Sequence, residues 1–248
     1  MAAIERRESL PMYQYEHFAK FYDATMGNRA GSAEFVHNLI QTHAPQAKTL
    51  LELACGTGAV LEHLAAHYDV AGLDVSPAML RIAGARLPNV ELHQADMTAF
   101  ELGRTFDALI CVFDSINHLL TFRSWKEVFR SSVKHLAERG VFIFDINTET
   151  KLRRHAREPA WVKTLDNGTV IIKVTEAGKG ISNWNIKVFE HRGGERYRLH
   201  EENIQEISFP VNRIVEALHR KFNKVRVVDP ARPRPGRQSD RLYFICKR

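Results

Sequence analysis

The stretch Thr49-Leu-Leu-Glu-Leu-Ala-Cys-Gly-Thr-Gly58 decides the fold of this 248-residue chain. Its apolar run predicts a buried strand, its two glycines predict a tight turn, and residues 59–67 have the spacing of a helix. Glycine has no Cβ to keep a ligand away, so such a turn brings backbone N–H groups and a helix N-terminus to a bound molecule. A dinucleotide fingerprint would need a third glycine where Leu61 stands, which disfavours a bound pyrophosphate. We therefore expect another kind of ligand at the carboxyl end of this strand.

Three further segments extend this pattern. Val70-Ala-Gly-Leu-Asp74 predicts a strand that ends in an acid, and Ser76 caps the helix that follows. Residues 90–97 and 106–113 predict a third and a fourth strand. The four segments together resemble the motifs of class I S-adenosylmethionine (SAM) dependent methyltransferases. The resemblance implies SAM as the cofactor, with an acid on the ribose and an Asp-Met pair at the adenine, and it assigns cofactor contacts to Glu52, Ala54, Gly56, Gly58, Asp74, Val75, Met79, Asp96, Met97 and Phe113.

Aromatic residues recur at helical intervals in the first thirty residues, which by periodicity alone favours packing. The same string resembles the N-terminal cap of small-molecule methyltransferases, a helix that folds over the SAM site. By that resemblance Tyr13, Tyr22 and Arg29 face the methionine end of SAM or the substrate. Arg29 would offer its guanidinium to the methionine carboxylate.

The hydrophobic pattern changes near residue 150. Before it, strands and helices alternate and the strands are continuous apolar runs, as in a parallel sheet covered on both faces. After it, apolar and polar residues alternate around the turn signals Asp166-Asn167-Gly168 and Gly193-Gly194. The predicted fold class is α/β, a doubly wound, Rossmann-like, seven-stranded methyltransferase core with an inserted antiparallel β-sheet. We expect the cap and SAM-binding core over 1–150, the inserted sheet over 151–205, and a last helix and two strands of the core over 206–248.

Four polar residues follow the predicted fourth strand, namely Asp114, Ser115, Asn117 and His118. They could simply satisfy a loop backbone. The string Ser-Ile-Asn-His-Leu, however, resembles the Ser-Ile-Gly-His-Leu of amino-sugar N-methyltransferases, with Asn117 where those enzymes have glycine. This resemblance implies His118 as the catalytic base, since imidazole titrates near neutral pH, and Asp114, Ser115 and Asn117 as substrate-binding residues.

Composition narrows the setting. No stretch approaches the roughly 18 apolar residues of a membrane span, and the first residues are charged where a signal peptide would be apolar. Cys55, Cys111 and Cys246 lie in apolar segments, which favours reduced thiols and a cytoplasmic protein. His63 and His67 share a helical face but lack an acidic partner, so we expect no metal site there.

Three functions remain open at this stage. The first is a SAM-dependent methyltransferase that acts on an N or O atom of a small-molecule acceptor, with the inserted sheet as pocket wall or as the interface of a homo-oligomer. The second is an RNA or protein methyltransferase that docks through basic loops, because the formal charge is +6 and residues 231–241 hold Arg232, Arg234, Arg237 and Arg241. The third is a SAM-binding module without catalysis. The sequence favours the first but does not identify the acceptor.

Overall fold

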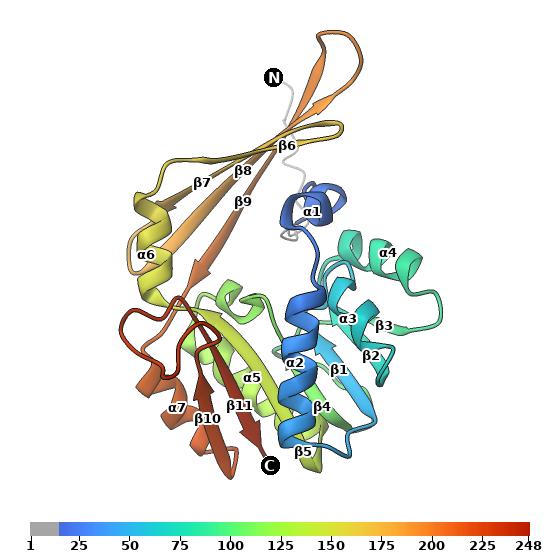
Figure 1. Ribbon diagram of the computed structural model, residues 1–248, viewed down its shortest axis with the longest axis vertical. Helices are drawn as coiled ribbons and strands as arrows, with labels where there is room; N and C mark the ends of the chain where they lie inside the picture. The colour runs from blue at the N-terminus through green and yellow to red at the C-terminus, as the bar shows by residue number, and fades with distance from the viewer. Residues whose placement is uncertain (1–14) are drawn as a thin grey trace, which may run out of the picture.

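The computed structural model describes residues 15–248, which form a helix-covered sheet and a second sheet that stands over it (Figure 1). The first sheet has the strand order β10-β11-β5-β4-β1-β2-β3. In chain order its strands are β1 (Thr49–Leu53), β2 (Asp69–Asp74), β3 (Glu91–Gln94), β4 (Phe106–Cys111), β5 (Leu136–Asn147), β10 (Lys224–Val228) and β11 (Arg241–Lys247). The doubly wound, seven-stranded core is thus confirmed.

The core sheet is mixed, and its parallel part is the part before residue 150, as the sequence pattern predicted. The pairs among β1 to β5 are parallel, but β11 runs antiparallel to both β5 and β10. The reason is the connection, because β10 and β11 are joined by the arginine-containing loop and not by a crossover helix, and a loop hairpin produces antiparallel strands.

Helices bury both faces of this sheet. Neighbouring side chains of a strand point to opposite faces, so each strand packs against helices on both sides. Leu50 packs with α2 (Ala30–His43) and α3 (Ala59–Leu64) on one face. Leu51 packs on the other face with α5 (Phe122–His135) and α7 (Val211–His219). The remaining core helices are α4 (Pro77–Arg86) and the short 3₁₀ helix η1 (Ser115–His118) after β4.

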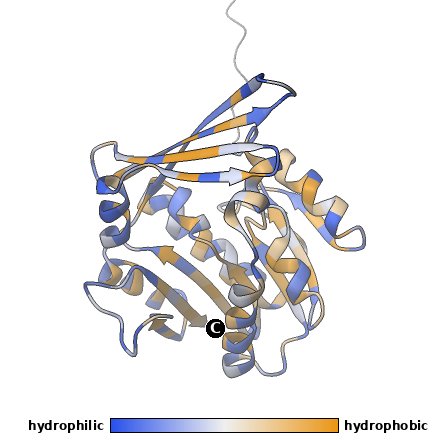
Figure 2. Ribbon diagram, turned by 45° about the horizontal axis from the view of Figure 1, so that its top comes forward, coloured by the Kyte–Doolittle hydropathy of each residue, from blue (hydrophilic) through white to orange (hydrophobic). Residues whose placement is uncertain are grey.

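The inserted sheet has four antiparallel strands in the order β6-β7-β8-β9. They are β6 (Trp161–Leu165), β7 (Gly168–Glu176), β8 (Ile181–His191) and β9 (Tyr197–Ile207). Figure 2 shows the alternation of hydrophobic and hydrophilic residues along them. The first hairpin requires Gly168, since a Cβ there would lie 2.2 Å from the carbonyl oxygen of Phe189.

The sheet does not begin at residue 151 as predicted. Residues 149–157 form helix α6 (Glu149–Arg157), because the Thr148 side chain caps its first turn and accepts a hydrogen bond from the Lys151 N–H. The ion pair between Arg153 and Glu149, one helical turn apart, adds a smaller contribution. Strand β9 continues to Ile207, two residues past the predicted end of the insert.

Helix α1 (Ala19–Met26) lies between the two sheets (Figure 1). Phe18 and Phe21 pack on the inner face of the inserted sheet against residues such as Val170 and Ile186. Ala19 packs on the core side with Met79 of α4. The aromatic face that the sequence predicted therefore fixes α1 to the insert, while its opposite side touches the cofactor half of the core.

Candidate active site

A small cavity lies beside the glycine turn after β1, where the motif predicts a ligand. Its walls come from α1, from the turn and from the end of β4. It is lined by Tyr22, Arg29, Glu52, Ala54, Cys55, Gly56, Thr57, Ala59, Val60, Val112, Phe113 and Ser115. Six predicted cofactor residues thus meet here, and Ser115, predicted to bind substrate, lies on this side as well, with its Oγ donating to the Val112 carbonyl at 2.7 Å.

Asp74 holds the glycine turn in place. Its carboxylate accepts hydrogen bonds from the N–H of Gly56 and the N–H of Ser76, both at 2.8 Å. Burial raises the pKa of Asp74, and these N–H donors oppose that rise. The acid that the motif places on a ribose therefore also fixes the backbone next to it.

The other predicted cofactor residues lie outside this cavity. Gly58 adopts φ +74° at the start of α3, where a Cβ would come within 3.0 Å of a leucine methyl group. Met79 is buried, Val75 is exposed, and Met97 is buried with its sulfur 3.9 Å from Cys111 Sγ. Asp96 is exposed and accepts hydrogen bonds from Thr98, so it caps a turn at the edge of the core. Tyr13 lies outside the described residues.

Helix α1 is tied directly to the glycine turn, by residues that the sequence analysis missed. Asp23 accepts a hydrogen bond from Thr57 Oγ1 at 2.7 Å and pairs with Arg86 at 2.6 Å. Arg86 also donates to the Thr57 carbonyl at 2.8 Å. These bonds position the cap over the site.

The small cavity fits the methionine end of SAM. Arg29 stacks on the ring of Phe113, with 3.9 Å between the guanidinium carbon and the ring centroid. Its Nη2 atom and the Oε2 atom of Glu52 are buried without a hydrogen-bond partner among residues 15–248. A buried donor and a buried acceptor of opposite charge match the carboxylate and the ammonium of an amino acid, and leaving them unpaired is costly.

A larger cavity of about 450 Å³ adjoins the small one, between the carboxyl ends of the core strands and the inner face of the insert. Its apolar wall comes from α1 and the insert: Tyr15, Phe18, Met26, Trp161, Ile172, Val174, Trp184, Ile186 and Ile204. Its polar groups include Asp114, Asn147, Lys151, Glu206 and Arg241, and it shares Tyr22, Arg29 and Phe113 with the small cavity.

The backbone is strained where the two cavities meet. Phe113 and Asp114 both have positive φ, 58° and 54°, which non-glycine residues rarely adopt. Such conformations cost on the order of 1–3 kcal/mol each and persist where the surrounding structure fixes them. Here they direct Phe113 to both cavities and Asp114 to the larger one.

Arg241 forms the centre of a buried ion network at the floor of the large cavity. It pairs with Asp114 and with Asp145, and it donates to Asn147 Oδ1 at 3.1 Å. Burial favours a higher pKa for Asp114, but Arg241 and then Lys151 bring that pKa below its usual range. The pKa of Asp145, which is wholly buried, is raised to about 6 despite the same guanidinium. Arg241 is therefore part of the site and not of a docking loop, contrary to its place in the second hypothesis.

Asn117 does not line either cavity, although the resemblance suggested a substrate contact. It is fully buried, donates to the carbonyls of Asn147 and Ile207 at 3.0 and 2.8 Å, and accepts from the Asn147 N–H at 3.1 Å. Its amide joins the end of β5 to the end of β9. The residue that replaces the glycine of the related motif is thus structural in this chain.

His118 lies behind the cavity wall rather than in it. Its Nδ1 lies 3.2 Å from the Gln205 carbonyl, which can only accept, so Nδ1 carries the proton. Its Nε2 lies 3.1 Å from the hydroxyl of Tyr15. Tyr15 lines the cavity, and its hydroxyl donates a hydrogen bond to Nε2 of the neutral imidazole. Burial lowers the pKa of His118, against the opposing charge of Asp114. The imidazole is thus connected to the cavity by its hydrogen bond with Tyr15.

Glu206 is the acidic residue of the site that sequence reasoning missed. It is only 4% exposed, lines the large cavity, and accepts from Asn147 Nδ2 at 3.0 Å. Burial, followed by the charge of Asp114, raises the pKa of Glu206 to about 8. The one available signal was its place on the inner face of β9, two residues after the buried Ile204.

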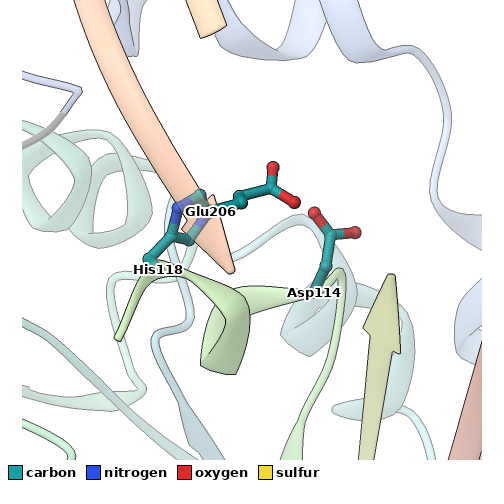
Figure 3. A group of neighbouring side chains, drawn as sticks. All are labelled: Asp114, His118 and Glu206. Carbon is teal, nitrogen blue, oxygen red and sulfur yellow. The ribbon is translucent and has the colours of Figure 1, made fainter. Parts of the chain in front are cut away.

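Asp114 and Glu206 at the cavity floor lie close to the imidazole of His118 behind the wall, and Figure 3 shows the two carboxylates turned toward each other. One ligand atom from each lies within 4.8 Å of the others, and this is the one such trio among residues 15–248. The arrangement suits a positively charged group. His67, by contrast, lies against the tilted ring of His37 with 4.1 Å between ring centroids, away from this floor.

Known proteins match both the sequence and the fold. The family model for a methyltransferase domain matches residues 50–140. The dTDP-3-amino-3,4,6-trideoxy-alpha-D-glucopyranose N,N-dimethyltransferase of Streptomyces venezuelae is 37% identical over 138 residues, which cover 54% of this chain and 58% of that protein. The chain thus matches little more than half the length of such curated sugar N,N-dimethyltransferases.

Solved structures match over nearly the whole chain. DesVI of Streptomyces venezuelae has a TM-score of 0.81 at 27% identity, covering 94% of this chain and 99% of its own. The sugar N-methyltransferase KedS8 of a Streptoalloteichus species has a TM-score of 0.81 at 26% identity, and the match covers 100% of this chain and 98% of KedS8. In fold, and in the sequence of residues 50–140, the chain is similar to SAM-dependent methyltransferases. Among these it resembles the amino-sugar N-methyltransferases.

Within residues 15–248, no helix is long and apolar enough to cross a membrane.

Proposed function

We propose that the protein transfers a methyl group from SAM to an amine nitrogen of a small-molecule acceptor, of the amino-sugar kind, bound in the large cavity. The observation that carries this proposal is the junction of the two cavities, whose shared walls are Tyr22, Arg29 and Phe113. A cofactor in the small cavity and an acceptor in the large one would meet there, and holding two reactants in line can supply roughly 7–11 kcal/mol of a barrier.

Nitrogen is favoured over oxygen by the charges at the cavity floor. Asp114 and Glu206 offer two carboxyl groups to the same space, which suits an amine in its ammonium form. One relative named above is an N,N-dimethyltransferase of a dTDP-linked amino sugar and another, KedS8, is a sugar N-methyltransferase, which supports the same acceptor class.

Each half of the site has a defined task. When bound, SAM supplies the electrophilic methyl carbon. Arg29 and Glu52 would hold its methionine end, and Asp74 its ribose. The apolar wall of the insert would cover the acceptor and exclude water, while His118 positions the Tyr15 hydroxyl at the edge of the cavity.

The other hypotheses have less support. Arg241 is bound within the site, and the loop residues Arg232, Arg234 and Arg237 are exposed and line neither the small nor the large cavity. A binding module without catalysis would not need the adjoining 450 Å³ cavity. Two finer expectations stay proposals: a homo-oligomer through the insert, supported by the exposed Val162, Tyr197 and Leu199, and a cytoplasmic setting, supported by three free, buried cysteines.

The test is release of S-adenosylhomocysteine by purified protein. Acceptors would be a dTDP-linked amino sugar, the same sugar with a hydroxyl in place of the amine, and total RNA, with an acceptor-free control. We expect release that depends on the amine and is absent with the hydroxyl compound. Release with RNA alone, or equal release with amine and hydroxyl, would contradict the proposal.

A further inference from the structure

Glu206 reaches the acceptor cavity from the inserted sheet, not from the core. It stands one residue before the end of β9, and its carboxyl group faces that of Asp114, which follows β4 (Figure 3). One oxygen accepts from Asn147 Nδ2 at 3.0 Å. Among residues 15–248, the other oxygen has no hydrogen-bond partner, and no lysine, arginine or histidine forms a salt bridge with Glu206.

The other candidate bases of the cavity floor are engaged. Asp114 pairs with Arg241, and so does Asp145. His118 is bonded through both ring nitrogens. Glu206 differs from the two aspartates because it forms no ion pair among residues 15–248, so its free oxygen can take up a proton without the loss of a bound cation.

We propose that Glu206 binds the acceptor amine in its ammonium form and accepts one of its protons before methyl transfer. The inference rests on the proposed function. In the first step an N–H bond of the ammonium breaks and the proton passes to a Glu206 oxygen, which leaves a neutral amine with a lone pair. In the second step that lone pair forms the bond to the methyl carbon, and the carbon–sulfur bond breaks with its electron pair on sulfur. The proton on Glu206 is then released to water.

The surroundings of Glu206 suit this task. The charged and titratable groups that face it are Asp114 after β4, His118 in η1, Lys151 in α6, Arg241 in β11, and Tyr15 before α1. Burial and the nearby Asp114 raise its pKa to about 8, above that of an ordinary carboxyl group. An alkylammonium has a pKa of about 10, so a carboxyl group with a raised pKa takes up its proton at a smaller free-energy cost than an ordinary glutamate does. A base matched in this way to its substrate is more effective.

A divalent metal ion is the competing occupant of this trio. Two features oppose it: the positive charges of Arg241 and Lys151 lie at the same floor, and His118 would have to give up its bond to Tyr15 or to Gln205. An ammonium carries one charge and donates hydrogen bonds, so it needs none of these changes.

The test compares Glu206→Gln with Glu201→Gln, which removes the same charge on the same strand from an exposed residue paired with Lys187. With an amine acceptor at neutral pH, we expect Glu206→Gln to lower kcat/KM by about 10²–10⁴ while SAM affinity is retained, and Glu201→Gln to match the wild type. Glu206→Asp, which keeps a carboxyl group, should recover part of the loss.

The pH profile separates proton transfer from a structural role. The deficit of Glu206→Gln should shrink as pH rises toward the pKa of the acceptor, because the amine then arrives without its proton. A deficit that is constant with pH, or a fully active and folded Glu206→Gln protein, would overturn the inference. So would loss of wild-type activity in EDTA with recovery in Mg²⁺ or Mn²⁺. If the wild type methylates no amine at all, the proposed function fails instead, which is a distinct result.

Discussion

The core sheet and the inserted sheet bury their side chains in different ways. Core strands such as β4 and β5 are covered by helices on both faces, so residues 108–111 and 141–144 are continuously apolar and buried, and the polar residues of the site stand at or after the carboxyl ends of these strands. Strand β9 of the insert has only one covered face, and Glu206 is a member of that face. The cofactor side of the site is therefore built from strand ends and turns, whereas the acceptor side is built from the face of a sheet.

The largest effect is expected from removal of Arg241, the cation of the buried ion network. Arg241→Ala would leave the wholly buried Asp145 and the adjacent Asp114 without their partner. Removing one member of a buried ion pair usually destabilises by about 3–5 kcal/mol, which urea denaturation would measure. Arg237→Ala, at an exposed residue of the loop that precedes β11, is the control and should change the free energy of unfolding by less than about 0.5 kcal/mol. A loss below about 1 kcal/mol for Arg241→Ala would mean that water solvates the two acids.

SAM affinity should depend on the strand ends and turns of the core. Asp74→Ala removes the acceptor of the Gly56 and Ser76 N–H groups as well as the expected partner of the ribose, so SAM binding should weaken by about 1–3 kcal/mol in calorimetric titration. Asp69→Ala, at the exposed start of the same strand, should leave the dissociation constant unchanged. Equal affinity of Asp74→Ala and wild type would mean that the ribose is held elsewhere.

His118 tests whether the two halves act together. His118→Ala should lower turnover about tenfold, which corresponds to the free energy of about one hydrogen bond. SAM affinity should be retained. Tyr15→Phe should cause a similar drop, and the double variant should be no worse than either single one, because both residues belong to one unit. A drop of 10²–10⁴ for His118→Ala alone would instead support imidazole as the base.

The smallest effect belongs to the exposed loop. Replacing Arg232, Arg234 and Arg237 together by serine should change turnover of an amine acceptor by less than about twofold and stability by less than about 0.5 kcal/mol per residue. Steady-state kinetics on the small acceptor would check this. A large rise in KM would show that the loop takes part in acceptor binding.

The same difference explains what the sequence could predict. Glu52, Gly56 and Arg29 were predicted because a glycine turn and a cap string fix local geometry, and local geometry is encoded by neighbours in the chain. Glu206 was missed because its role depends on packing between β9 and β4, which lie far apart in the sequence. Asn117 was misassigned for the same reason, since its partners Asn147 and Ile207 are distant. Residues 151–157 were misassigned because a short, charged helix carries little hydrophobic signal.

Tyr22 of α1 belongs to the walls of both cavities, and α1 is bonded both to the glycine turn through Asp23 and to the insert through the ion pair of Lys20 with Glu190. A ligand bound in one cavity therefore also affects how well α1 is ordered in the wall of the other cavity. If one ligand contributes the free energy that fixes α1, the second ligand need not contribute it again. By thermodynamic reciprocity, each ligand then raises the affinity for the other by the same factor. The two substrates of such an enzyme would bind cooperatively through α1, in addition to any contact that they make with each other.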